Sequence, residues 1–307
     1  MTKIIETHHL SKHFGPVRAV DDVSLHVEKG EIYGFLGLNG AGKTTMIRML
    51  LGLIAPTRGE ITIMGQGIVR GGHGPWEDIG CLVETPYSYP ELTVTENLEI
   101  YKRLRGITDV KAVDKVISKL KLDPYKHRKA GHLSLGNSQR LGLAKALIHN
   151  PAILFLDEPS NSLDPSGIVE IRELLLDLAN NQNVTIFISS HNLGEISRLA
   201  GRIGIIHQGA LVQEVKSTDL EGLLKKRLLV NTRDNQRAMR VLTEQGYKPV
   251  LNSQGCLELT DPKSISAPET INAMLTSQSV PPFMLYPDIE DLEAYFLRTI
   301  GAEGGVQ

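Results

Sequence analysis

The spacing of apolar and polar residues near the start of the chain predicts strands that lead into a helix. In the stretch VDDVSLHVEKGEIYGFLG, Val23, Leu25 and Val27 alternate with polar residues, as they do in a half-buried strand. The next strand, residues 32–36, is mostly apolar and runs directly into a glycine-rich loop. The sequence KTTMIRMLLG then has the pattern of a helix that ends at Gly52. We therefore expect an antiparallel portion followed by a β-α unit.

Two later segments are apolar almost throughout. Residues 152–156 read AILFL and residues 184–189 read VTIFIS, which suits strands that are buried on both faces of a parallel sheet. Between them, Asp164 and Pro165 predict a helix start, because the carboxylate can cap the helix and proline fits its first turn. Residues 204–215 predict a closing hairpin. This order of elements predicts an α/β core with flanking antiparallel strands.

A lysine-rich segment between these strands carries a helical pattern instead. Residues from Thr95 to about Leu122 are expected to be helical, and Pro151 ends a further helix. A short strand is expected near Ile61, after the turn PTRG. The first domain, residues 1–220, should therefore hold a parallel core sheet, an antiparallel β subdomain and a helical subdomain.

The pattern changes near Leu220, and the remainder predicts a small α+β domain. Its order is strand, helix, strand, strand, helix, strand and a last helix, which fits a ferredoxin-like domain over residues 221–307. The located strands are Leu228–Asn231, Leu257–Leu259 and Phe283–Tyr286, and the helices are Asn235–Gln245, Glu269–Ser277 and Ile289–Ile300.

Composition narrows the class of protein. The formal net charge of the 307 residues is -2, so the chain has no basic footprint and nucleic acid is not an expected partner. No segment approaches the roughly 18 apolar residues of a membrane helix, and the first residues lack the apolar core of a signal peptide. Cys81 and Cys256 lie far apart and are expected to be reduced thiols. We expect a cytosolic protein, or the cytosolic part of a larger assembly.

The glycine-rich loop has the spacing of a phosphate-binding loop. GLNGAGKTT fits G-x-x-x-x-G-K-[ST], in which backbone N–H groups and the start of a helix surround phosphate oxygens. The lysine would reach the β- and γ-phosphates of a nucleoside triphosphate, and the first threonine would bind magnesium. The residues expected to bind the nucleotide are Gly37, Leu38, Asn39, Gly40, Ala41, Gly42, Lys43, Thr44 and Thr45.

Two carboxylates follow the apolar strand AILFL, where such a loop needs a metal ligand. Asp157 would hold magnesium, and Glu158 would polarise the water that attacks the γ-phosphate. His191 follows the next strand and could contact the γ-phosphate from the opposite side. A single acid or histidine after a strand is usually incidental, and it is the combination with the phosphate loop that favours these roles.

With these motifs the chain resembles the ATP-binding subunits of ABC transporters over about residues 4–220. LSLGNSQR, residues 133–140, is similar to the LSGGQ-type signature of that family, and NSLD, residues 161–164, is similar to its D-loop. His191 matches the family's switch histidine. Phe14 stands where the family places an aromatic ring that stacks on adenine. The resemblance implies a P-loop ATPase with the ABC-type nucleotide-binding fold.

The resemblance also implies partners. Two copies of the chain would close head to tail, with each ATP between the phosphate loop of one copy and the signature of the other. A membrane permease would use this closing and reopening to move its substrate. The residues implied to contact ATP in trans are Ser134, Gly136, Asn137 and Asp164. The signature departs from the family pattern at Leu135 and Asn137, and Ser160 and Ser162 replace a commoner threonine and glycine, so the reach of the Asn137 side chain is left open.

Glu84 departs from the family most clearly, because glutamine is usual at this position. There the residue touches magnesium and the attacking water, so the resemblance implies that Glu84 is a metal contact. An acid about 5 Å from a divalent ion changes the energy by roughly 3 kcal/mol per unit of cation charge at an effective dielectric of about 20. The alternative is that Glu84 points to solvent.

An acid at this position resembles transporters that confer bacitracin resistance or lantibiotic self-immunity. The resemblance implies an exporter subunit that lies on the cytoplasmic side of the membrane and helps to clear a peptide antibiotic from that membrane. Tyr87 and Tyr89 would face the permease, or else pack locally beside two prolines. The alternative function is a soluble ABC ATPase that acts on ribosomes or DNA. For the C-terminal domain, either regulator binding or stabilisation of the dimer is open.

Overall fold

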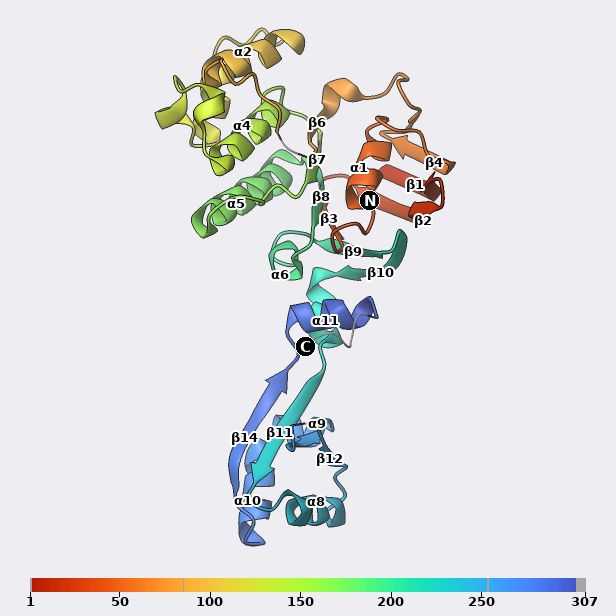
Figure 1. The fold of residues 1–307 in the computed structure, drawn as a ribbon, viewed down its shortest axis with the longest axis vertical. Helices are drawn as coiled ribbons and strands as arrows, with labels where there is room; N and C mark the ends of the chain where they lie inside the picture. The colour runs from red at the N-terminus through yellow and green to blue at the C-terminus, as the bar shows by residue number, and fades with distance from the viewer. Residues whose placement is uncertain (1, 85, 253, 302–307) are drawn as a thin grey trace. The chain divides into compact units, whose positions relative to one another are not determined.

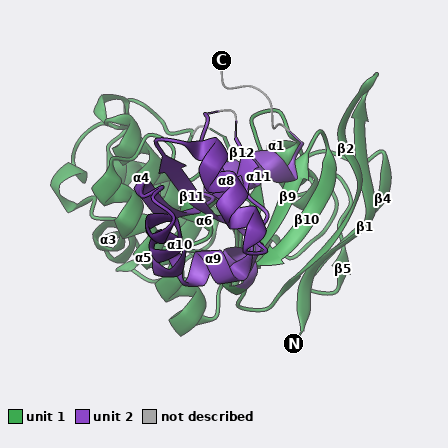
Figure 2. Cartoon of the chain, turned by 90° about the horizontal axis from the view of Figure 1, so that it is seen from below, with its two compact units in different colours: residues 1–218 green, residues 219–307 purple. Residues whose placement is uncertain are grey.

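The computed structural model describes residues 2–84, 86–252 and 254–301. By its internal contacts the chain divides into two compact units, Met1–Thr218 and Asp219–Gln307. Figure 2 shows the first unit in green and the second in purple. The phosphate loop belongs to the first unit.

A six-stranded sheet forms the centre of the first unit. Its strand order is β10-β9-β3-β8-β7-β6, with parallel pairing throughout except for the antiparallel pair β9 and β10. The strands are β3 (Ile32–Leu36), β6 (Ile79–Leu82), β7 (Ile153–Asp157), β8 (Thr185–Ser190), β9 (Arg202–His207) and β10 (Ala210–Lys216). Strands β3, β7 and β8 are buried along their whole length, and β9 and β10 pair antiparallel, so both the parallel core and the hairpin expected from the sequence are confirmed.

The second sheet of this unit is antiparallel, as expected, and helix α1 packs between the two sheets (Figure 1). Its order is β2-β1-β4-β5, formed by β1 (Lys3–Phe14), β2 (Val17–Glu28), β4 (Arg58–Ile63) and β5 (Gln66–Gly67). Helix α1 (Lys43–Leu50) buries Met46, Ile47, Met49 and Leu50 completely. Since both sheets share this core, the helix that follows the phosphate loop is held firmly.

A group of helices lies on the other side of the central sheet (Figure 1). They are α2 (Val94–Leu104), α3 (Ala112–Lys119), α4 (Leu135–Leu147), α5 (Pro165–Gln182) and α6 (Leu193–Ile196). Single 3-10 turns lie at several places along the chain, at Trp76–Asp78, Asp123–Tyr125, Ala130–His132 and Ser217–Asp219. The expectation of continuous helix from Thr95 to Leu122 is wrong. The helix breaks at Gly106, whose φ of 64° is left-handed, and resumes only at Ala112.

The second unit has one antiparallel sheet with helices packed against it. Its strand order is β12-β13-β11-β14. The strands are β11 (Lys226–Thr232), β12 (Val250–Leu251), β13 (Leu257–Leu259) and β14 (Pro282–Ile289), and the helices are α7 (Leu220–Leu223), α8 (Asn235–Glu244), α9 (Pro262–Ser266), α10 (Pro268–Ser277) and α11 (Leu292–Thr299). Leu228, Val230, Leu257 and Leu259 face Ala238 and Leu242 of α8 and Ile271 and Leu275 of α10 in a separate core. This unit therefore has its own hydrophobic core.

Candidate functional site

The phosphate loop joins β3 to α1, and its glycines are required by close contacts. A Cβ on Gly42 would lie 2.2 Å from the carbonyl oxygen of Ala19, and a Cβ on Gly37 would lie 2.6 Å from that of Ile206. Gly40 and Gly42 have φ values of 81° and 112°, which side chains other than glycine rarely adopt. The loop can therefore bring its N–H groups close to an anion at the start of α1.

Lys43, the first residue of α1, points back over this loop. Its ammonium donates to the carbonyl oxygens of Gly37 at 2.6 Å and Leu38 at 3.2 Å, and it lies 3.1 Å from Oε1 of Glu158. Only 6% of the side chain is exposed. The cation is therefore held at the loop by neutral oxygens and one carboxylate, a position from which it can reach a bound phosphate.

Thr44 and Asp157 present two adjacent oxygen donors. The Thr44 hydroxyl donates to Oδ2 of Asp157 at 2.7 Å, and the buried Ser189 hydroxyl donates to Oδ1 at 2.6 Å. Hydroxyl and carboxylate oxygens are ligands that Mg²⁺ prefers, and Mg²⁺ commonly takes its other ligands from phosphate and water. Within the described residues no three His, Cys, Asp or Glu side chains form a metal cage. The pair fits a magnesium ion that arrives with a nucleotide.

Glu158 and His191 form a second pair beside Lys43. Oε2 of Glu158 lies 2.8 Å from Nδ1 of His191, while Oε1 faces the Lys43 ammonium. The Glu158 backbone has a φ of 49°, and its N–H donates to the Ser189 hydroxyl at 3.1 Å. Both carboxylate oxygens are thus oriented by basic groups, and the carboxylate lies beside the phosphate loop, where a general base for an attacking water would be placed.

The strand register explains why these residues meet. Asp157 pairs with Ser189 in β7 and β8, and Leu36 pairs with Ser190 in β3 and β8. The carboxyl ends of three parallel strands therefore lie at one edge of the sheet, which is where α/β folds bind ligands.

Ser189 was not identified from the sequence, although it contacts both acidic positions. It is fully buried at the end of β8, donates to Asp157 and accepts from the backbone of Glu158. A hydroxyl near the end of an otherwise apolar strand was the available signal.

We expect Ser189→Ala to lower kcat for ATP about tenfold, because the loss of one buried hydrogen bond to a charged group costs about 1.5 kcal/mol, with little change in nucleotide Kd.

The matched control for Ser189→Ala is Thr185→Val on the same strand. The Thr185 hydroxyl is also buried, but it accepts a hydrogen bond from the N–H of Gly30 at the other end of β8. Both variants should lose stability, and only Ser189→Ala should lose turnover. Equal kcat values for the two variants would mean that Ser189 acts only through stability.

Glu84 follows β6 and lines the same cleft as Thr44, Asp157 and Glu158. The cleft has a volume of about 610 Å³. The Glu84 backbone has a φ of 59°, and its carboxylate makes an ion pair with Arg48 of α1. Glu84 is thus placed where a metal contact is feasible, but in this structure its side chain has a protein partner.

The residues expected to act in trans form a second group, at the starts of α4 and α5. Ser134 caps α4 by accepting from the N–H of Asn137 at 3.3 Å, and a Cβ on Gly136 would lie 3.1 Å from the carbonyl oxygen of Ser162. Asp164 caps α5, and its hydrogen bonds with the Ser166 hydroxyl and the Gly167 N–H hold the pKa of its carboxyl below the usual value. The signature and the D-loop therefore touch within one chain.

Phe14 stands at the end of β1, with half of its side chain exposed. The ammonium of Lys12 lies 5.0 Å from the centre of its ring. The exposed Phe14 ring can stack on another aromatic ring, although the Lys12 ammonium already contacts part of the ring surface.

The segment after Glu84 exposes two aromatic rings, and buried polar side chains hold its backbone in place. Tyr87 and Tyr89 pack edge to face with their centres 5.8 Å apart, and 72% of Tyr87 is exposed. The buried ammonium of Lys145 donates to the carbonyl oxygen of Tyr87 and the hydroxyl of Ser88, and burial lowers the pKa of Lys145 to about 8. Asn97, also buried, bonds to both the N–H and the carbonyl of Tyr89.

Fold and site together define a P-loop nucleoside triphosphatase. A family profile described as ABC transporter matches residues 20–161. The chain is 40% identical to the bacitracin transport ATP-binding protein BcrA of Bacillus licheniformis over 98% of both chains. It is 34% identical to the lantibiotic transport ATP-binding protein SrtF of Streptococcus pyogenes, over 75% of this chain and 100% of that protein. The chain belongs to the family of ABC transporter ATP-binding proteins, and it is an ABC ATPase.

Solved structures agree on the fold of the first unit. The ATP-binding cassette MJ0796, in a dimeric post-hydrolysis state bound to ADP and phosphate, matches with a TM-score of 0.64 and 25% identity. That match covers 70% of this chain and 99% of the cassette. A structure described as the ATP binding subunit of an ABC transporter matches with a TM-score of 0.65 and 27% identity, over 71% of this chain and 92% of that one. The expected likeness to bacitracin and lantibiotic transport proteins is confirmed as well.

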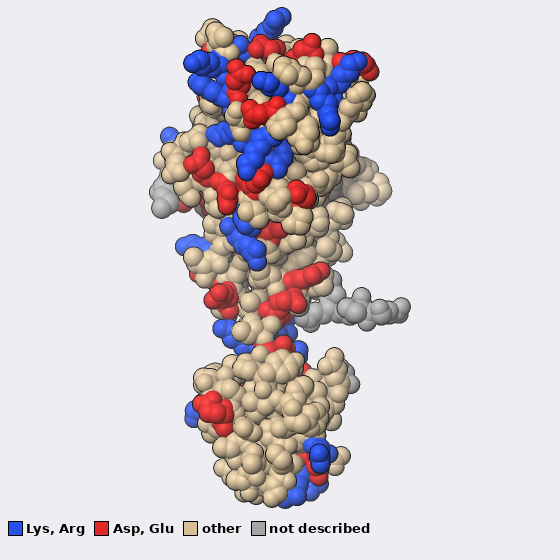
Figure 3. Space-filling view, turned by 90° about the vertical axis from the view of Figure 1, so that its left-hand side faces the viewer, with Lys and Arg blue, Asp and Glu red and all other residues tan. Residues whose placement is uncertain are grey.

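The surface charge of the first unit and the length and apolarity of the helices can be compared with the sequence-based expectations about partners. Lys and Arg side chains alternate with Asp and Glu over the face of the first unit seen in Figure 3, without a continuous basic area on that face. In the part of the chain that the structure describes, no helix is both long and apolar enough to cross a membrane.

Proposed function

We propose that this chain hydrolyses ATP to drive a separate membrane permease that expels a peptide antibiotic of the bacitracin or lantibiotic type. The observation that carries the proposal is the similarity to the bacitracin transport protein over 98% of both chains, which includes the second unit. The acid at Glu84, where glutamine is usual in the family, supports the same group. The chain would lie on the cytoplasmic side of the membrane, attached through the permease.

Each site residue has a distinct role in ATP binding or hydrolysis that follows from its position. Lys43 and the loop N–H groups bind the phosphates, and Lys43 exchanges its contact with Glu158 for the γ-phosphate. Thr44 and Asp157 hold magnesium, which when bound stabilises the charge that develops on the β- and γ-phosphates. Glu158 accepts a proton from the attacking water, and His191 orients this carboxylate and contacts the γ-phosphate.

A second copy of the chain would complete each site. The starts of α4 and α5 combine a capping side chain with free helix N–H groups, so they suit a second anion contact. Ser134, Gly136, Asn137 and Asp164 of one copy would therefore meet the ATP held by the phosphate loop of the other. ATP holds the two copies together, and loss of the γ-phosphate contacts after hydrolysis lets them separate.

The permease would dock near Tyr87 and Tyr89. The two rings are exposed, while Lys145 and Asn97 fix the backbone beneath them. Large aromatic side chains on a rigid support are typical of interface cores. Residues 221–307 would form an accessory domain of ferredoxin-like topology, which the strand order β12-β13-β11-β14 supports.

The test is a deletion strain of the source organism that expresses either the wild-type chain or Glu158→Gln. We expect the wild type, but not the variant, to restore growth in bacitracin or a lantibiotic, with at least a several-fold difference in inhibitory concentration. A tagged chain should copurify with a hydrophobic membrane protein. Copurification with ribosomes or DNA, and unchanged sensitivity to both peptides, would favour the alternative ATPase.

A further inference from the structure

The ion pair between Glu84 and Arg48 links the loop after β6 to the helix after the phosphate loop. Arg48 lies four residues after Thr44, so both side chains project from the same face of α1. Thr44 contacts Asp157, and Glu84 and Asp157 line one cleft. Arg48 therefore binds a carboxylate one helical turn away from the expected metal position.

The backbone around Glu84 is fixed on both sides. Before it, β6 is paired with β7 as far as Leu82. After it, Lys145 binds the carbonyl of Tyr87 and the hydroxyl of Ser88. A new position for the Glu84 carboxylate can thus come from a rotation of its own side chain.

The charges of the cleft differ in how firmly they are balanced. Glu158 faces the buried Lys43 and His191, and Asp157 receives two hydroxyl hydrogen bonds. The Glu84–Arg48 pair is more open, with 55% of the acid side chain and 38% of the base exposed. Pairs this exposed are weak, so a divalent ion in the cleft can attract Glu84 away from Arg48.

We propose that Arg48 is a positioning residue for Glu84, which holds the carboxylate at the wall of the cleft and competes with the magnesium ion for it. Arg48 thereby balances the acid that replaces the usual glutamine when the metal is absent. It also raises the metal concentration at which Glu84 turns toward the metal–nucleotide complex. The inference rests on the proposed function, because it requires that the cleft bind magnesium together with a nucleotide.

The test measures metal binding rather than turnover. Free Mn²⁺ is followed by electron spin resonance in the presence of the full-length chain and a non-hydrolysable ATP analogue. Arg48→Met keeps a long unbranched side chain with good helix propensity, so α1 should be preserved. We expect it to lower the Kd for Mn²⁺ about three- to fivefold. Glu84→Gln should raise that Kd, and Arg48→Met should have no further effect in the Glu84→Gln background.

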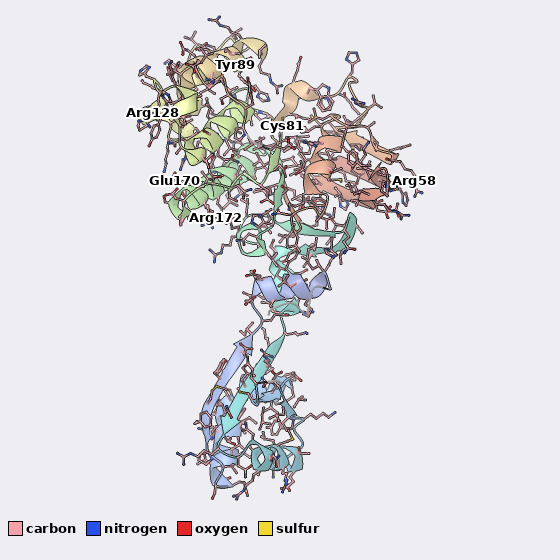
Figure 4. The ribbon with its side chains drawn as sticks, viewed as in Figure 1. Arg58, Cys81, Tyr89, Arg128, Glu170 and Arg172 are labelled. Carbon is pink, nitrogen blue, oxygen red and sulfur yellow. The ribbon has the colours of Figure 1, made fainter. Side chains whose placement is uncertain are left out.

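The matched control is Arg58→Met on β4. Arg58 lies 3.5 Å from Asp22, and 71% of the arginine and 56% of the acid side chain are exposed, so this pair is at least as open as the one at Glu84. Figure 4 shows Arg58 on the outer side of its sheet, far from Tyr89. This variant should leave Mn²⁺ binding unchanged.

Other results would overturn the proposal. A higher or unchanged Kd for Mn²⁺ in Arg48→Met would show that Arg48 does not compete for this carboxylate. An equal shift of that Kd in the wild-type and Glu84→Gln backgrounds would show the same. The proposed function would survive those results as long as the wild-type chain binds the analogue and Lys43→Ala binds it more weakly. Failure of the wild-type chain to bind the analogue would overturn both.

Discussion

Glu158→Gln is expected to abolish ATP turnover and to leave the chain as a stable ATP-bound dimer. The amide has the size of the carboxylate, so the packing around Glu158 should be retained, but it cannot accept the proton of the attacking water. Loss of a general base lowers turnover by about 10²- to 10⁴-fold. ATP affinity should be equal or higher, because the contact of 3.1 Å between Glu158 and Lys43 no longer competes with the γ-phosphate.

The measurement is steady-state hydrolysis together with size-exclusion chromatography at saturating ATP and Mg²⁺. Glu60→Gln, an exposed acid on β4, serves as the control and should behave as wild type. Turnover within twofold of wild type in Glu158→Gln would rule out Glu158 as the base. A monomer at saturating ATP would argue instead against ATP as the link between the two copies.

Lys43→Ala is expected to weaken ATP binding by about 10- to 100-fold. Charge-assisted hydrogen bonds contribute about 1.5–3 kcal/mol each, and the Lys43 ammonium is the buried cation directed at the phosphate loop. Isothermal titration with ATP in the presence of Mg²⁺ measures the change. Unchanged affinity would contradict the role of the loop as a phosphate site.

A double variant separates the ligand role of Lys43 from its structural role. Removing the lysine alone leaves the Glu158 carboxylate, with 16% of its side chain exposed, without its lysine partner. Lys43→Ala should therefore also lower Tm. Lys43→Ala combined with Glu158→Gln should recover most of this stability and none of the ATP affinity. Recovery of both would mean that the loss of binding came from a distorted loop.

The prediction of local elements depended on how strong the local pattern was. Strand β3 has the bounds expected from its sequence, because an apolar run ends there in a glycine-rich loop. The sequence pattern predicts too long a helix after Thr95, because one glycine in a lysine-rich segment is a weak signal. Gly106 ends α2 there by adopting a left-handed φ.

The sequence alone determined which chemical groups the protein has and the order in which they occur. The phosphate loop, the acid pair and the histidine each follow a strand, and this is visible locally because each motif is short and continuous. Only the tertiary structure decided which of these groups touch. The contacts of Asp157 with Thr44 and Ser189, and of Glu84 with Arg48, join residues 32 to 113 positions apart. They exist because parallel strands bring their carboxyl ends to one edge of the sheet beside α1, and no short window of sequence contains that arrangement.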